Sequence, residues 1–305
     1  MIHTAPYGKP QVFIRPFINF GVALFLFISG YLINVDSINK KKFYKKRIKR
    51  VLIPYFIWTS LYTIVEFIGS EFNLKKFIMN FALAKSAAMM YYIFVYIQFI
   101  LLTPFLCKLV KSKYNWLGWL IAPLSVIIKY YWLFFKIDPN DIISSLYDVC
   151  CLGWFTYYYL GLYLKNRSAS LKCDLKKLII IYIITILLQI LEGYGWYSFG
   201  NMSCGTQLKI SSFLTGVSFI MIAYWYINND KYIGKNRLLI LVGDYSFGIY
   251  ISHIIFINIL NKIIPTWKQI PFVINSLIVL SISLLFVIIG KKILGEKIGK
   301  YIGLY

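Results

Sequence analysis

The chain has 305 residues, of which 59% are hydrophobic and 19% aromatic, and its mean hydropathy is +0.68. It carries 33 lysines and arginines against 11 acidic residues, which gives a formal net charge of +22. This composition is too apolar for a soluble globular protein, and it predicts an all-α, polytopic transmembrane helical bundle. The basic residues lie in short segments between apolar stretches and not on one domain, so nucleic acid is not an expected partner.

Apolar windows of about 20 residues, the length that crosses a bilayer, predict the spans. In chain order there are nine, at residues 12–34, 51–69, 91–110, 116–135, 146–164, 178–194, 210–228, 238–261 and 271–290. The apolar stretch Phe77–Ala84 is too short to cross, and we expect it at the membrane interface. Because the connections are short, we expect a single membrane domain over residues 1–305 and no soluble domain.

The basic residues fall on alternate connections between these spans. The largest group is Lys40–Arg50, and smaller groups lie at Lys108–Lys113, Lys165–Lys177, Lys231–Arg237 and after Gly290. Cytoplasmic loops are enriched in lysine and arginine, so these segments and the C-terminus are predicted to be cytoplasmic and residues 1–11 to lie outside. Contact with anionic membrane lipids then accounts for the net charge. A composition rich in Ile, Lys, Tyr and Asn is typical of a low-GC bacterial genome, which predicts a multi-pass protein of a bacterial plasma membrane.

The segment Met1–Gly8 is neither a signal peptide nor a complete span. It is similar to the outer end of a helix whose first part is missing, and we expect a start about 15–20 residues earlier, the length of one more span. A tenth helix would also return the N-terminus to the cytoplasm. The five cysteines show no spacing typical of metal ligands, so no metal site is expected.

Several motifs follow one another along the chain. His3 ends a helical stretch, Phe25-Leu26-Phe27-Ile28-Ser29-Gly30-Tyr31 lies in the next, and Arg47-Ile48-Lys49-Arg50 precedes Pro54-Tyr55. Weaker matches lie at Gln98–Pro104, Leu160–Leu164 and Tyr245–His253. In this order and spacing they resemble the integral-membrane acyltransferase-3 family, with its first-helix histidine, its FFxSGY-like helix and its RxxR motif before a proline and an aromatic residue.

The sequence departs from this family at two places. Most of the helix that ends at His3 is absent, so His3 is expected on a frayed terminus. Position 23 is alanine where many members have proline.

The resemblance implies acyl transfer, usually of acetyl, from cytoplasmic acyl-CoA to a hydroxyl of a glycan or small molecule. Acetyl-CoA would then be a donor substrate, with no permanently bound cofactor, and the acceptor a cell-envelope polysaccharide or glycan precursor. A sugar hydroxyl needs a base during its attack on a thioester, and histidine suits that task near neutral pH. The chain has two histidines, His3 and His253. No residue stands out as a covalent nucleophile, and Ser29-Gly30-Tyr31 is expected to serve helix packing.

From the resemblance we expect His3 to be the general base. Without the family, an interfacial histidine would be the preferred interpretation. His253 lies in the outer half of its predicted span, and an ionisable residue there is a functional candidate. We expect it to form a hydrogen bond within the bundle, with the lining of an acceptor cavity as the alternative.

Arg47 and Arg50 are three residues apart, on one side of a helix, and guanidinium groups bind phosphates in a bidentate manner. We expect them to bind the phosphates of CoA, with lipid headgroups as the alternative. Arg15 is expected to reach the outer interface; alternatively it orients the acceptor or stabilises the oxyanion. Glu66, Asp148, Glu192 and Asp244 are candidates to hold the His3 imidazole, and Glu66 has the most suitable predicted depth.

Two other functions compete with acyl transfer. A transporter or flippase of lipid-linked glycans also has many helices, but no internal repeat is visible and the charges gather at one surface. A polysaccharide polymerase is expected to have large outer loops that carry arginines, and the longest predicted outer loops, 70–90 and 195–209, contain none.

Overall fold

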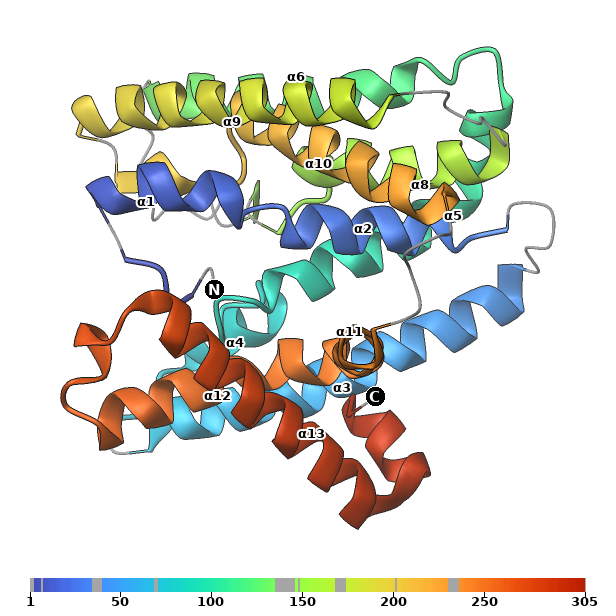
Figure 1. Cartoon of the computed structure of the whole chain (residues 1–305). Coiled ribbons are helices and arrows are strands. Elements are labelled where there is room, and N and C mark those ends of the chain that lie inside the picture. Colours follow the sequence, from blue (N-terminus) through green and yellow to red (C-terminus); the bar gives the residue numbers. More distant parts are fainter. Residues whose placement is uncertain are drawn as a thin grey trace.

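The computed structural model describes residues 3–6, 8–34, 40–68, 71–134, 146–147, 149–167, 174–200, 202–229 and 236–304. Every regular element within these ranges is a helix (Figure 1). The α-helices are α1 (Lys9–Ile14), α2 (Gly21–Tyr31), α3 (Lys40–Phe67), α4 (Leu74–Ala82), α5 (Tyr91–Lys111), α6 (Leu117–Phe134), α8 (Phe155–Arg167), α9 (Leu175–Ser198), α10 (Ile210–Asn228), α11 (Arg237–Asp244), α12 (Ser246–Ile263) and α13 (Phe272–Ile302). Short 3-10 turns are η1 (Arg15–Phe17), η2 (Leu152–Trp154), η3 (Met202–Gly205) and η4 (Trp267–Gln269).

Long apolar helices make this a multi-pass membrane protein. Six described segments are long and apolar enough to cross a bilayer: Lys9–Tyr31, Tyr91–Lys111, Leu175–Ser198, Ile210–Asn228, Ser246–Ile263 and Phe272–Ile302. Their outer faces leave large apolar side chains exposed, as on α9, where Ile180, Ile184, Leu187 and Leu191 follow helical spacing and are each at least half exposed. A continuous apolar stripe of this kind fits a lipid environment.

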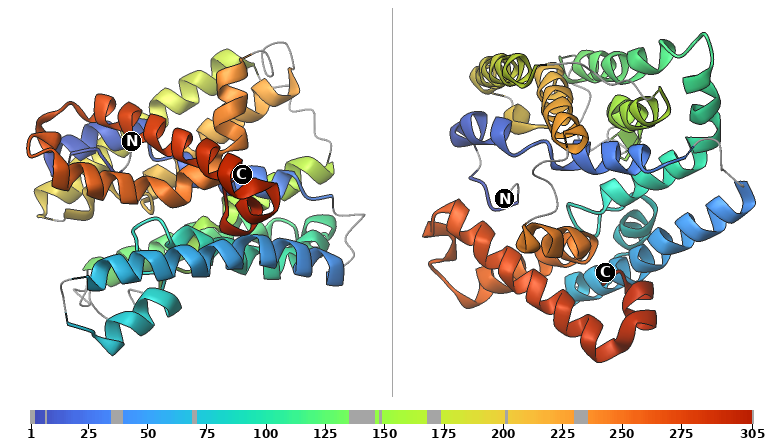
Figure 2. Two further views of the ribbon diagram at one scale, coloured as in Figure 1. Left: turned by 90° about the horizontal axis from the view of Figure 1, so that it is seen from below. Right: turned by 45° about the vertical axis from the view of Figure 1, so that its right-hand side comes forward.

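The helices form two groups. In one, α2 packs against α8 and α10, α9 packs against α10 and α1, and α6 packs against α8. In the other, α13 packs against α12 and α3, and α4 packs against α3. Helix α5 contacts both α3 and α8 and so joins the groups. Figure 1 and the right-hand view of Figure 2 show α12 and α13 well away from α9 and α10, with the N-terminal end of the chain between them.

Glycines allow α2 and α8 to pack backbone to backbone. A Cβ atom added to Gly30 would collide with the carbonyl oxygen of Tyr158, and one added to Gly161 would collide with the carbonyl oxygen of Phe27. Small residues permit such close approach in membrane helices. The packing role predicted for the Ser29-Gly30-Tyr31 motif is thus confirmed for Gly30.

One face of α3 holds three other elements in place. Tyr55, Trp58 and Tyr62, at helical spacing, each donate a hydrogen bond to a backbone carbonyl of a different element. The acceptors lie near the end of α4, at the end of α13 and in α12, at 2.8, 2.8 and 3.0 Å. Helix α3 therefore fixes the elements that carry one side of the site described below.

The structure differs from the predicted spans at three places. In the predicted span 146–164 the helix α8 starts at Phe155 and has 13 residues, about 20 Å. Its apolar side chains are buried in the protein and do not face lipid. The predicted span 238–261 consists of two helices that meet at Tyr245. Beyond the predicted span 271–290, α13 continues to Ile302 with a break at Gly295, where φ is 75°.

Candidate active site

A cavity of about 710 Å³ lies between the two groups of helices. Its wall comes from the N-terminal segment, η1, α2, residues 83–91, α6, η2, residues 205–208 and α12. Polar side chains of the wall include those of His3, Arg15, Lys85, Lys129, Gln207 and His253. Residues from both ends of the sequence therefore meet at this one cavity.

The two histidines of the chain lie side by side in this wall. The ring centroids of His3 and His253 are 5.3 Å apart, and the ring planes are inclined by 41°. Arg15 lines the same cavity. The structure thus brings together three of the residues that the sequence singled out.

The segment that carries His3 is anchored to the second group of helices. Thr4 Oγ1 lies 2.7 Å from Ser276 Oγ of α13, and Ala5 is buried. The sequence predicted a frayed terminus at His3, but tertiary contacts with α12 and α13 hold this short segment against the bundle.

Backbone contacts define the protonation of the His253 ring. Its Nδ1 atom lies 2.7 Å from the carbonyl oxygen of Tyr250 and 3.2 Å from that of Ile249. A carbonyl oxygen only accepts hydrogen bonds, so Nδ1 carries the proton and the neutral ring keeps its lone pair on Nε2. His253 therefore forms a hydrogen bond within the bundle, as the sequence predicted, and it also lies in the wall of this cavity.

His3 is a neutral imidazole at physiological pH. It precedes α1, outside the helices, and burial together with the neighbouring His253 lowers its pKa from 6.5 to about 3. Arg15 acts in the same direction, because a positive charge nearby disfavours imidazolium. The ring therefore has a free lone pair to accept a proton but holds that proton weakly.

A row of aromatic rings connects the histidine pair with Arg47. The ring of Tyr250 lies 6.1 Å from that of His253 and 5.4 Å from that of Tyr92, which in turn stacks on Tyr96 at 6.0 Å. Arg47 Nη1 donates a 3.2 Å hydrogen bond to Tyr96 Oη. Arg47 thus lies at the opposite end of this row from the histidines.

The two arginines of the RxxR motif have different surroundings. Arg47 is partly buried and its guanidinium carbon lies 5.1 Å from the centre of the Phe43 ring, whereas Arg50 is exposed. Neither residue lines the cavity with the histidines. A ligand bound by both would lie at the N-terminal half of α3.

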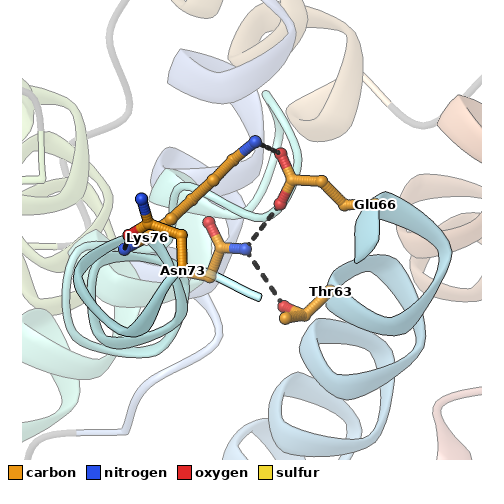
Figure 3. A network of polar contacts seen from close by, with 5 residues as sticks. Thr63, Glu66, Asn73 and Lys76 are labelled. Carbon is orange, nitrogen blue, oxygen red and sulfur yellow. Dashed lines mark hydrogen bonds and ion pairs between the residues drawn. The ribbon is translucent and has the colours of Figure 1, made fainter. Parts of the chain in front are cut away.

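Glu66 lies in a separate polar network (Figure 3). Its carboxylate forms a 2.9 Å ion pair with Lys76 and accepts a 2.7 Å hydrogen bond from Asn80 Nδ2, which also donates to Thr63 Oγ1. This network fastens α4 to α3 and does not include His3.

Glu192 and Asp244 are also not part of the cavity wall. Glu192 of α9 accepts hydrogen bonds from the backbone N–H and the hydroxyl of Ser211. Asp244 ends α11, and Asp148 lies outside the described residues. No carboxylate lines the cavity in the part of the chain that the structure describes, so His253 is the ionisable group that contacts the His3 ring.

Sequence reasoning gave little weight to several residues at or near the site. Gln98 of α5 donates to the carbonyl of Val149 at 2.6 Å and accepts from the N–H of Cys151 at 3.0 Å, which positions the segment before η2. Lys129 lies within the predicted span 116–135, and an ionisable residue inside a span is a functional candidate. Lys85 lies in a connection between spans, and its position in the sequence does not indicate a function.

Buried Lys209 is structural. It donates a 2.6 Å hydrogen bond to the carbonyl of Cys204, next to the cavity-lining segment 205–208. Among the described residues, no group of histidine, cysteine, aspartate and glutamate side chains has the arrangement of a metal site.

Comparison with known protein families matches residues 1–291 to the acyltransferase-3 family, described as an acyltransferase domain. No curated protein and no solved structure matches the chain.

Proposed function

The chain belongs to the acyltransferase-3 family, and we propose that it is a membrane O-acyltransferase of the surface-polysaccharide type. In this proposal it moves an acyl group, most simply acetyl, from cytoplasmic acyl-CoA to a hydroxyl of a cell-envelope polysaccharide or glycan precursor. The observation that carries the proposal is the pairing of His3 with His253 beside Arg15 in one cavity.

We propose nine crossings of a bacterial plasma membrane, with the C-terminus in the cytoplasm. The crossings are α1 with α2, α3, α5, α6, the segment 149–167 that contains η2 and α8, α9, α10, α12 and α13. The basic start of α3 would then face the cytoplasm, and the cavity would open toward the outside. This orientation lets donor and acceptor approach from opposite sides.

The donor binds at the N-terminal half of α3. Arg47 and Arg50 bind the phosphates of acyl-CoA, because planar guanidinium groups match phosphate oxygens. The pantetheine arm then follows the row formed by Tyr96, Tyr92 and Tyr250 toward the histidines. The contact between Arg47 and Tyr96 supports this path, since it puts the arginine at the start of the row.

His3 is the general base of the reaction. It removes the proton of the acceptor hydroxyl while that oxygen attacks the thioester carbonyl, and the carbon–sulfur bond breaks as the tetrahedral intermediate collapses. The proton on His3 then passes to the CoA thiolate, so that free CoA and the ester leave. His253, with Nδ1–H tied to the backbone, shares the imidazolium charge through Nε2, and Arg15 stabilises the oxyanion.

Binding of the donor tests this assignment without knowledge of the acceptor. Acetyl-CoA is titrated into the purified protein in nanodiscs, with Arg47→Ala compared to Lys45→Ala, an exposed lysine of the same helix. We expect Arg47→Ala to weaken binding about tenfold or more and Lys45→Ala to change it little. Equal affinity of both variants and the wild type would contradict the donor site.

A further inference from the structure

The charged residues that line the cavity all have the same sign. Arg15 of η1, Lys85 between α4 and α5, and Lys129 of α6 line it, and no carboxylate does within the described ranges. The three cations come from separate elements, so the fold gathers positive charge at this place. Like charges beside apolar walls focus a positive potential and attract anions.

Two polar groups of the wall lack a hydrogen-bond partner among the described residues. They are the indole N–H of Trp154, a residue only 2% exposed, and the side-chain oxygen of Gln207. A buried polar group without a partner is costly. Both atoms are closed off from the cavity, so they pair with a ligand once their side chains turn toward it. A saccharide offers both the hydroxyl donors and the oxygen acceptors that they need.

Proton transfer to His3 is opposed by the surroundings of its ring. Burial, His253 and Arg15 all disfavour the imidazolium form of His3. A negative charge bound near Arg15, Lys85 and Lys129 would offset this repulsion and strengthen His3 as a base once the acceptor is in place.

We therefore propose that the acceptor is an anionic saccharide, with a phosphate or carboxylate group beside the hydroxyl that is acylated. Lys85 and Lys129 bind the anionic group, next to Arg15, and Trp154 and Gln207 bind the sugar. A cavity of about 710 Å³ is of a size for a small saccharide. This inference rests on the acyl-transfer function proposed above. The phosphates of acyl-CoA are also anionic groups that lysine and arginine can bind. The experiment therefore measures binding of the donor and of the acceptor separately.

The test uses methyl glucuronide and methyl glucoside, which differ by one carboxylate, titrated calorimetrically into the protein in nanodiscs of zwitterionic lipid. The double variant Lys85→Gln/Lys129→Gln is compared with Lys75→Gln, which changes an exposed lysine of α4 outside the cavity. We expect the wild type and Lys75→Gln to bind the glucuronide about tenfold tighter than the glucoside. In the double variant this ratio falls to about one, while the affinity for acetyl-CoA is unchanged.

Three results would overturn the anionic acceptor: equal or absent binding of both sugars by the wild type, a preference that survives in the double variant, or a double variant that loses acetyl-CoA instead. Release of CoA thiol from acetyl-CoA separates this inference from the proposed function. If no CoA thiol is released with any acceptor but the protein still prefers the glucuronide, the acyl-transfer function is contradicted and the anionic binding site is not. Equal kcat/KM for both sugars contradicts the anionic acceptor alone.

Discussion

His3 and His253 come from opposite ends of the sequence, yet their ring centroids lie 5.3 Å apart at the wall of one cavity. The backbone around Tyr250 fixes the tautomer of one ring, and burial keeps the other neutral. A proton acceptor therefore stands next to a second imidazole that can share its charge, an arrangement that suits general-base catalysis.

The pH profile is expected to differ between the free enzyme and the enzyme with bound acceptor. Only neutral His3 acts as a base, and its pKa of about 3 puts the acid limb of kcat/KM well below 6.5. Among the described residues, the titratable or charged side chains that line the cavity with His3 are those of His253, Arg15, Lys85, Lys129, Tyr91 and Tyr250. A bound anionic acceptor raises the pKa of His3. The acid limb of the kcat profile should therefore lie at higher pH than the acid limb of the kcat/KM profile. Coincident limbs near pH 6.5 would contradict the burial of His3.

Arg47→Lys is expected to raise KM for acetyl-CoA while leaving kcat nearly unchanged. Lysine keeps the charge but loses the planar, bidentate contact with phosphate and the reach to Tyr96, a loss of about 1.5–3 kcal/mol for hydrogen bonds to charged groups. Steady-state kinetics of CoA release measure both constants. If kcat falls with KM constant, Arg47 acts on the chemical step and the donor assignment is wrong.

Gly161→Ala is expected to destabilise the contact between α2 and α8. The added methyl group meets the Phe27 carbonyl, and such overpacking costs about 1–3 kcal/mol. Thermal unfolding in detergent should show a lower midpoint. Gly195→Ala is the matched control, because a Cβ at Gly195 of α9 meets open space; equal midpoints for the two variants would contradict the close packing.

Tyr62→Phe is expected to lower activity more than stability. The change removes the hydrogen bond to the Ile251 carbonyl, worth about 0.5–1.5 kcal/mol, two residues before His253 on α12. Since α12 then loses its tie to α3, His253 is less well positioned and kcat should fall severalfold. Tyr226→Phe, on a half-exposed ring of α10, controls for loss of a phenol hydroxyl. A kcat equal to that of the control would exclude this positioning role.

The sequence was sufficient for the family and for most helices, because motif order and long apolar runs carry that information. It did not reveal that α8 is a short buried helix, since the apolar run at Phe155–Leu164 suits a protein core as well as a lipid-facing span. Nor did it predict the pairing of His3 with His253, because long-range contacts between helices leave no local pattern. The role of Glu66 depends on Lys76 and Asn80 of α4, whose orientation is likewise set by tertiary packing.

Mass spectrometry of cell-envelope glycan tests the central claim most directly. The glycan is taken from cells that express the wild type, His3→Ala, or the control Lys262→Ala, an exposed lysine near the end of α12. With all three proteins folded in the membrane, the account predicts added acyl mass with the wild type and the control and none with His3→Ala. Added acyl mass that persists in His3→Ala, or glycan that is unchanged by the wild type, would contradict it.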